Sequence, residues 1–341
     1  METKKFAMFG AGFWANFQLP AWQELDNIEC VAVYNRTKSK AEDLAEKFGV
    51  ARVYDDPEEL LNNEDLDFVD ILTDVDTHFK FTKMAAERGL DVVCQKPMAP
   101  NYEDAKELVQ VCKKNNVKLF INENFRWQAP LRKVKEIVDS GKIGRVFKGR
   151  VSFCSAFPVF DNQPFLAELE QFILTDIGSH IFDVSRFLMG DVETLFCETQ
   201  TVNPKIKGED VANALMKMKS GAHCYAEMSY ASILEKEVFP QTLVLLEGTK
   251  GSVRLDAGFE VVTTTKEGST REKVEPVMYN WLDPEYAVVH SSIVDEQRDI
   301  LNGLRGGKAE TTGDDNFKTA QLVWAAYESA KTGKVINMDD F

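Results

Sequence analysis

Three polar side chains recur at helical spacing in the segment Thr175–Asp183. Asp176, His180 and Asp183 stand at positions i, i+4 and i+7, so on a helix they share one face. A histidine with a carboxylate one turn away on either side can be tuned for proton transfer near neutral pH. Two other interpretations stay open, a capped helix with a satisfied histidine and a metal site. No second His or Cys cluster supports a metal, so we predict no metal ligands.

A lysine follows a short apolar run elsewhere in the chain. Asp91–Cys94 is typical of a buried strand, and Gln95-Lys96-Pro97 comes directly after it. In a doubly wound sheet, ligands bind at the carboxyl ends of the strands. This topology therefore places Lys96 near a bound cofactor. The alternative is an ordinary surface lysine.

A glycine motif near the beginning of the sequence offers a phosphate site. The run Gly10-Ala11-Gly12-Phe13-Trp14-Ala15 has the pattern GxGxxA between an apolar strand and a helix. In dinucleotide-binding folds, the second glycine lets the backbone approach a pyrophosphate, and the small final residue lets helix and strand pack closely. The motif predicts dinucleotide binding by Gly10, Gly12, Phe13, Trp14 and Ala15.

The choice between NAD and NADP depends on the residue about 20 positions beyond this motif. That residue is Asn35, and Arg36-Thr37-Lys38 follows it, so no carboxylate stands there to repel a 2′-phosphate. Arg36, Thr37 and Lys38 are able to hydrogen-bond or neutralise that phosphate. We therefore favour NADP and retain NAD as the alternative.

These candidates need a scaffold that brings strand ends together, and the first third of the chain supplies one. Short apolar runs alternate with amphipathic segments through residue 125, which indicates a parallel sheet covered on both faces. The expected strands are Lys5–Phe9, Ile28–Tyr34, Arg52–Tyr54, Asp67–Leu72, Asp91–Cys94 and Lys118–Ile121. The expected helices are Phe13–Leu25, Lys38–Phe48, Thr77–Arg88 and Tyr102–Asn115.

The pattern changes after residue 125. A helix is expected over Leu131–Ser140 and another over Phe172–Met189, and two more near Ser291–Leu304 and Asp314–Lys331. Between them lie strand-like runs joined by hairpin turns, which indicates a mostly antiparallel sheet. These runs are Arg145–Phe157, Leu195–Val202, Ala212–Met218, Ala222–Ala231, Leu243–Glu247 and Ser252–Leu255. We predict an α/β protein with a Rossmann domain over 1–125 and a second α/β domain over 126–341, whose terminal helix packs back on the first.

Composition limits the possible partners. The 341 residues carry 40 basic and 55 acidic side chains, a net charge of −15. Such acidity argues against nucleic acid or a membrane surface, although residues 35–40 are locally basic. The six cysteines are scattered without metal or disulfide spacing, as in a reducing compartment. We expect a cytoplasmic protein that acts on a small molecule.

Taken together, the motifs resemble the Gfo/Idh/MocA family of oxidoreductases. The resemblance runs through the whole chain in order. It comprises GxGxxA, Gln95-Lys96-Pro97, Asn124-Phe125-Arg126-Trp127 with Pro130, Gly141-Lys142-Ile143-Gly144, Asp176-x-Gly178-x-His180 with Asp183, Glu209-Asp210, and Ser329-Ala330-Lys331-Thr332-Gly333-Lys334. Two positions depart from the family pattern. Gln95 replaces the usual glutamate, and Thr73-Asp74-Val75-Asp76-Thr77-His78 replaces a Thr-Pro-Asn loop with a following histidine.

The resemblance implies an NAD(P)-dependent enzyme acting on a sugar, polyol or related cyclic compound, and a homodimer or homotetramer. It implies catalysis by Lys96, Asp176 and His180, with His180 taking the hydroxyl proton and Lys96 stabilising the oxygen. It also places Thr73, His78, Gln95 and Lys96 at the cofactor. For substrate binding we predict Lys96, Asn124, Arg126, Trp127, Asp176 and His180. The alternatives are a trans-dihydrodiol dehydrogenase or biliverdin-type reductase, and a non-catalytic dinucleotide-binding regulator.

Overall fold

A computed structural model describes residues 2–341, apart from the side chain of Asn162. The chain divides into two compact units. The first unit runs to Asn124 and also takes in Met278–Pro284 and His290–Ala320. The second comprises Phe125–Val277, Glu285–Val289 and Gln321–Phe341. Two late segments of the chain therefore belong to the first unit.

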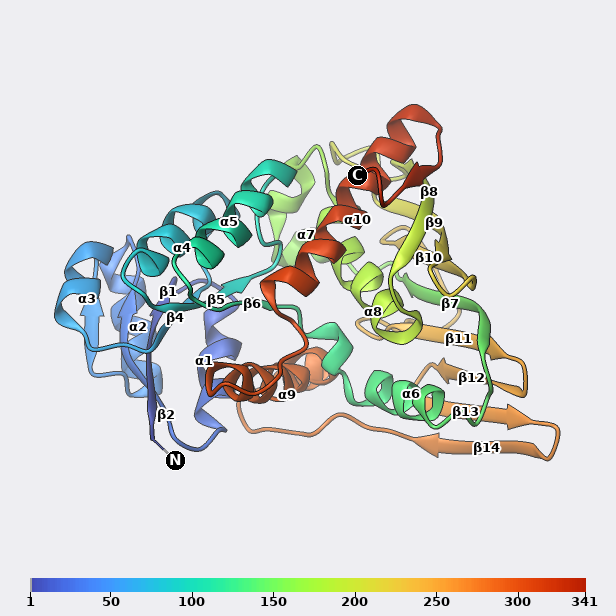
Figure 1. The fold of residues 1–341 in the computed structure, drawn as a ribbon, viewed down its shortest axis with the longest axis horizontal. Helices are drawn as coiled ribbons and strands as arrows, with labels where there is room; N and C mark the ends of the chain where they lie inside the picture. The colour runs from blue at the N-terminus through green and yellow to red at the C-terminus, as the bar shows by residue number, and fades with distance from the viewer. Residues whose placement is uncertain (1) are drawn as a thin grey trace. The chain divides into compact units, whose positions relative to one another are not determined.

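The first unit is a Rossmann-type sheet of six parallel strands in the order β3-β2-β1-β4-β5-β6 (Figure 1). The strands are β1 Lys4–Phe9, β2 Ile28–Tyr34, β3 Arg52–Tyr54, β4 Phe68–Ile71, β5 Asp91–Gln95 and β6 Leu119–Asn122. All six were expected from the sequence, and the central strands β1, β4 and β5 are mainly buried apolar runs, as strands covered on both faces are. The order reverses between β1 and β4, and in doubly wound sheets ligands bind at the strand ends beside such a reversal.

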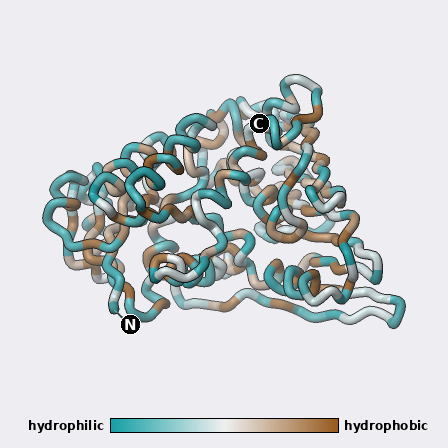
Figure 2. Tube along the Cα trace, in the orientation of Figure 1, coloured by the Kyte–Doolittle hydropathy of each residue, from teal (hydrophilic) through white to brown (hydrophobic). Residues whose placement is uncertain are grey.

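Helices cover both faces of this sheet. They are α1 Ala15–Gln23, α2 Lys38–Phe48, α3 Pro57–Asn63, α4 His78–Ala86 and α5 Tyr102–Lys114, with the short helix η1 Val75–Thr77 before α4. One apolar cluster joins α1, α2 and the end of α9 (Ala287–Leu304) to the sheet, while α4 and α5 lie on the other face (Figure 1). Figure 2 shows brown, apolar residues along the strands and mainly teal residues on the outer turns of α4 and α5.

Helix α3 is absent from the sequence prediction, although the sequence carries a signal for it. Asp56 accepts hydrogen bonds from the amides of Glu58 and Glu59, and Pro57 occupies the first turn. An aspartate before a proline is a typical helix start. The helix has only 7 residues, too few for a clear apolar period.

The second unit is built on a mixed sheet of nine strands in the order β14-β13-β12-β11-β7-β10-β9-β8-β15. The strands are β7 Val146–Cys154, β8 Val192–Gln200, β9 Val211–Met218, β10 His223–Ser229, β11 Leu243–Gly248, β12 Gly251–Asp256, β13 Glu260–Thr265, β14 Gly268–Lys273 and β15 Ile336–Asn337. Only β7 and β10 pair in parallel, and the other neighbours are antiparallel. This agrees with the mostly antiparallel sheet that the hairpin turns predict.

Helices α6 and α8 pack on one face of this second sheet. The helical segments are η2 Phe125–Trp127, α6 Ala129–Asp139, α7 Val159–Asn162, η3 Pro164–Glu168, η4 Leu174–Gly178 and α8 Ser179–Met189; η5 Pro284–Tyr286 and α10 Gly313–Thr332 complete the chain. Along β9 and β10, buried residues alternate with exposed ones, so the exposed side chains lie on the opposite face of the sheet. Among them, Leu215 and Tyr225 are each 42% exposed. One face of this sheet therefore lies open.

Two further properties bear on the class of protein. Within residues 2–341, no helix combines the length and apolar character needed to cross a bilayer. All six cysteines are free thiols, and four of them are buried. Burial raises the pKa of Cys224 to about 12, so this thiol is protonated and unreactive near neutral pH.

Candidate functional site

The glycine loop joins β1 to α1 and has the shape that a pyrophosphate site needs. Gly10 has φ +111°, and a Cβ there would lie 2.8 Å from the backbone carbon and oxygen of Leu72. A Cβ on Gly12 would meet nothing within 4 Å, whereas Ala15 is fully buried. The loop therefore fits a dinucleotide, with a tight turn, an open approach and close helix packing at successive positions.

The two aromatic residues of the loop differ in exposure. Phe13 is 55% exposed, and Trp14 is half-buried beside Phe17. Phe17 stacks on His290 with ring centroids 3.8 Å apart, and Trp14 meets the same ring edge-on. Burial lowers the pKa of His290 to about 4, so this ring is neutral at physiological pH. The structure thus gives Trp14 a packing role beside α9 in addition to its predicted place at the cofactor.

Asn35 closes the loop from the end of β2. Its Oδ1 accepts a hydrogen bond from the amide of Ala11 at 3.2 Å, and its Nδ2 donates to the carbonyl of Thr37 at 2.9 Å. Both halves of this amide are therefore used to shape the loop. Thr37 and Lys38 are exposed at the beginning of α2.

Arg36 is exposed and pairs with Asp74, with 3.3 Å between the guanidinium nitrogen and Oδ2. Asp74 belongs to the loop after β4, one of the two departures from the family pattern. The positive charge that the sequence offers to a 2′-phosphate is therefore balanced by a carboxylate from the end of β4, two strands away from β2 in the sheet. Sequence spacing did not anticipate this pair, because its partners come from separate βα units.

His78 ties together the loops after β4 and β5. The ring lies with Nδ1 3.1 Å from the carbonyl oxygen of Pro97 and Nε2 3.0 Å from that of Thr73. It is 1% exposed, and burial lowers its pKa despite these two carbonyls. In the same loops, the amide of Lys96 donates to Oε1 of Gln95 at 2.8 Å. The strand ends thus bring together the predicted residues Thr73, His78, Gln95 and Lys96.

In the second unit, the helix expected over Phe172–Met189 is interrupted by a π-turn over η4. Asp176 lies inside this turn and is half-buried, and His180 follows in the first turn of α8. A π-turn has i→i+5 hydrogen bonds, so it changes the spacing that an α-helix would give. The sequence predicts that Asp176, His180 and Asp183 share one face of a regular α-helix. This prediction is corrected for Asp176, which lies in the π-turn.

His180 is held by an aromatic neighbour. Its ring stacks on Phe125 with 3.7 Å between centroids and 5° between planes. Both residues are at most 5% exposed, and Phe125 also contacts Phe153. The stacking fixes the orientation of the imidazole, which a proton acceptor requires.

Asp176 is contacted by a residue that the sequence analysis missed. The hydroxyl of Tyr230 donates to Oδ2 of Asp176 at 3.4 Å, and the tyrosine ring stacks on Phe172. Burial raises the pKa of Tyr230 well above its usual value, so the hydroxyl keeps its proton. Tyr230 directly follows the end of β10, but its partner lies 54 positions away. In the sequence, the only signal for Tyr230 was its place near the end of the expected strand Ala222–Ala231.

Asp183 has a structural partner. It is fully buried, and the Nε of Arg126 donates to its Oδ2 at 2.7 Å while a second guanidinium nitrogen contacts Oδ1. This bidentate geometry is strong and directional. Arg126, predicted to bind substrate, thus meets a carboxylate of its own chain.

Two more predicted substrate residues also have contacts within their units. The ring of Trp127 is covered by the guanidinium of Arg132, 4.3 Å from the centroid. Nδ2 of Asn124 donates to the hydroxyl of Ser292 at 2.8 Å. Both side chains are at most 7% exposed. Substrate binding by these two residues stays a prediction.

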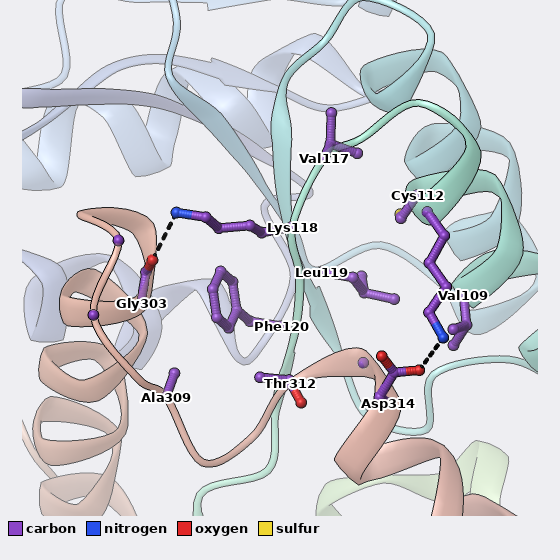
Figure 3. Close-up of a pocket in the computed structure, with 14 residues that line it drawn as sticks. Val109, Cys112, Val117, Lys118, Leu119, Phe120, Gly303, Ala309, Thr312 and Asp314 are labelled. Atoms are coloured by element: carbon purple, nitrogen blue, oxygen red, sulfur yellow. Dashed lines mark hydrogen bonds and ion pairs between the residues drawn. The ribbon is translucent and has the colours of Figure 1, made fainter.

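The structure also contains a pocket away from these residues (Figure 3). Its volume is about 280 Å³, and it lies between α5, β6 and the segment that joins α9 to α10. Lys118 reaches across it to the carbonyl of Gly303 at 2.8 Å, and Lys113 pairs with Asp314. None of the predicted site residues lines it. In the described part of the chain, no group of three His, Cys, Asp or Glu residues is arranged to hold a metal.

The fold and the glycine loop define a dinucleotide-binding oxidoreductase class, and comparisons with known proteins identify the family. Residues 4–123 match the oxidoreductase family with an NAD-binding Rossmann fold, and residues 131–254 match the GFO/IDH/MocA C-terminal domain. The chain belongs to the GFO/IDH/MocA family, and it is an NAD(P)-dependent oxidoreductase.

Full-length relatives agree with this family. The D-apiose dehydrogenase of Rhizobium rhizogenes is 40% identical over 99% of this chain and 98% of its own length. The myo-inositol 2-dehydrogenase of Thermotoga maritima is 25% identical over 93% of each chain. A crystal structure of an oxidoreductase from Agrobacterium radiobacter in complex with NAD⁺, L-tartaric acid and magnesium superposes with a TM-score of 0.97, at 40% identity and 99% coverage of both chains. The similarity to dehydrogenases supports an enzyme over the regulator alternative.

Proposed function

We propose that the chain oxidises a hydroxyl group of a sugar with a nicotinamide dinucleotide, and that D-apiose is the first substrate to test. The observation that carries this proposal is the pair of Asp176 and His180 on one helix, each held by an aromatic side chain. The sugar follows from the full-length relative named D-apiose dehydrogenase.

In the proposed mechanism, His180 accepts the proton of the reacting hydroxyl, for which its fixed ring is suited. Lys96 donates a hydrogen bond to the same oxygen and stabilises its developing negative charge. Asp176, oriented by Tyr230, accepts a hydrogen bond from a neighbouring substrate hydroxyl. The nicotinamide ring supplies the hydride acceptor when the cofactor is bound.

The cofactor would be held by the loop of residues 10–15, with its pyrophosphate against the open backbone at Gly12. The amide of Gly10 itself donates to the carbonyl of Tyr34 at 2.8 Å. NADP remains our prediction from the absence of a carboxylate at the end of β2. The Arg36–Asp74 pair makes the preference testable, because a 2′-phosphate must compete with Asp74 for Arg36. In Asp74→Asn, affinity for NADP should rise relative to NAD. Direct titration of each dinucleotide would measure the ratio, and an unchanged ratio would exclude Asp74 from the choice.

The deciding experiment for the function is a turnover assay of the purified chain. NAD⁺ and NADP⁺ would each be combined with D-apiose, myo-inositol and glucose, and reduction followed by nicotinamide absorbance. The proposal expects reduction with D-apiose and a loss of about 10²–10⁴-fold in kcat in His180→Ala. Dinucleotide binding without reduction of either cofactor across the sugars would contradict it.

Two further predictions complete the proposal. The open face of the nine-stranded sheet, including Leu215 and Tyr225, is the surface we expect a second copy to cover in a homodimer or homotetramer. Light scattering would measure the assembly, and a monomer at all concentrations would exclude it.

A cytoplasmic location also remains a prediction.

A further inference from the structure

Glu209 receives the amides at the beginning of the helical segment that carries Asp176 and His180. The amide of Phe172 lies 3.2 Å from its Oε1 and 3.3 Å from its Oε2, and the amide of Leu174 donates to Oε1 at 3.2 Å. The amide of Ile173 donates to the backbone carbonyl of Glu209 at 3.1 Å. Amides at a helix start have no partner within the helix, and a negative charge there is favourable. Glu209 therefore caps this helix from a distant part of the chain.

A second contact fixes the capping carboxylate. The hydroxyl of Tyr327 on α10 donates to Oε1 of Glu209 at 2.6 Å across 118 positions of sequence. Burial and the nearby Glu209 charge raise the pKa of Tyr327, so its hydroxyl stays protonated. Glu209 is only 7% exposed. Its orientation is thus set by two helices at once.

The chain just before Glu209 is built for close approach. A Cβ on Gly208 would lie 2.7 Å from the carbonyl oxygen of Leu169 and 3.1 Å from Cβ of Phe172. In proteins, a Cβ atom almost never lies within 3.0 Å of a heavy atom of a residue that is not adjacent in the chain. Glycine at 208 therefore lets Glu209 reach the start of the helix.

The next residue reaches Asp176 by another route. The carbonyl of Asp210 accepts the amide of Tyr230 at 2.9 Å, and the hydroxyl of Tyr230 donates to Asp176. Asp210 is itself held by the amides of Val202 and Asn203, which donate to its two carboxylate oxygens. Two adjacent residues thus hold Asp176 through the helix start on one side and through Tyr230 on the other.

We propose that Glu209 is a positioning residue for Asp176 and His180. The inference rests on the proposed function, in which these two side chains bind substrate and accept its proton. Removal of the cap releases the amides of residues 172–174, and the π-turn that follows directly loses its anchor. The expected result is a rotated helix start, a displaced Asp176 and an altered stack between His180 and Phe125.

The first test reads the position of His180 without any turnover. The chain has four histidines, so selective histidine labelling gives few NMR signals, and His180→Asn assigns the relevant one. Phe125 stacks on this ring, so its ring current shifts the imidazole signals upfield in the native geometry. Glu209→Gln and Tyr327→Phe should reduce this shift. Glu260→Gln, which makes the same change at an exposed pair with Arg271, should leave it unchanged.

The second test uses kinetics of the same folded variants. Glu209→Gln should lower kcat by about 10–100-fold, because small displacements of a reacting group are costly. It should leave the dissociation constant of the dinucleotide unchanged, move the pH dependence of kcat, and be milder than Glu209→Ala. Tyr327→Phe should show a smaller effect of the same kind and covers the case in which Glu209→Ala does not fold.

The outcomes separate this inference from the proposed function. If the wild type turns over no sugar, the proposed function fails, while the NMR comparison still decides whether Glu209 positions His180. If the wild type is active and Glu209→Gln loses thermal stability with unchanged His180 signals, kcat and pH profile, Glu209 is only a structural cap. That second result would overturn the proposal.

Discussion

The two units hold their candidate residues by different means. In the first unit, backbone geometry does most of the positioning, through the left-handed turn at Gly10 and the carboxyl ends of parallel strands. In the second unit, side chains from distant segments hold Asp176 and His180, through Tyr230 and Phe125.

This difference explains which site is visible in a sequence. A backbone-built site needs a glycine pattern directly after a strand, and both of these features are local in the sequence. A site built by side chains needs partners that only the folded sheet brings together. It follows that the first site should respond to added Cβ atoms and the second to the loss of single polar contacts.

The largest effect is expected on the stability of the second unit, when its buried ion pair between Arg126 and Asp183 is broken. Arg126→Met leaves the fully buried carboxylate of Asp183 without its bidentate partner, and such a loss costs about 3–5 kcal/mol. Chemical denaturation would measure the free energy of unfolding. The double variant Arg126→Met with Asp183→Leu removes both charges and should recover most of the loss. If the single and double variants were equally destabilised, the loss of stability would not come from the unpaired carboxylate of Asp183.

The next effect tests a buried polar contact inside the first unit. Asp70 is fully buried and accepts hydrogen bonds from Trp22 at 2.8 Å and Asn122 at 3.1 Å, yet burial raises its pKa from 3.8 to about 6. The folded state therefore binds a proton more tightly than the unfolded state. Stability from this group is present below pH 4 and is lost as the pH rises to about 6, by at most about 3 kcal/mol.

Asp70→Asn is the matched comparison, because it cannot ionise. The difference in unfolding free energy between wild type and Asp70→Asn should change between pH 4 and pH 6 and stay level above that range. Parallel pH profiles would show that Asp70 titrates normally.

A smaller effect separates two glycines of the same loop. Gly10→Ala places a Cβ against the backbone of Leu72 at positive φ, and should cost at least ~2 kcal/mol of stability. Gly12→Ala meets open space, so the unfolding free energy without cofactor should stay within ~0.5 kcal/mol. Both variants should bind dinucleotide more weakly. If Gly12→Ala kept full affinity, the backbone would not be the part of the loop that the cofactor approaches.

The smallest effect refines the picture of the second unit. Tyr230→Phe keeps the ring stacked on Phe172 and removes only the hydroxyl that reaches Asp176. A single hydrogen bond contributes about 1 kcal/mol, so kcat/KM for the sugar should fall about fivefold. Dinucleotide affinity should not change. A fall in cofactor affinity instead would show that the contact acts outside the substrate site.

The parallel sheet of the first unit, the glycine loop and the helical segment that carries Asp176 and His180 could all be predicted from the sequence. These features depend on interactions between near neighbours, so periodicity and glycine spacing report them. The sequence also indicated Lys96 at a strand end, because a strand and the residue after it are read together.

The partners of the side chains became known from the folded structure. It showed that Asn35 accepts a hydrogen bond from the amide of Ala11. It also showed two ion pairs, Arg36 with Asp74 and Arg126 with Asp183. It also showed the π-turn at Asp176 and the cap that Glu209 places on it across 35–37 positions. The physical reason is that a side chain's partner is set by which strands and helices pack side by side, and that packing is a property of the whole unit.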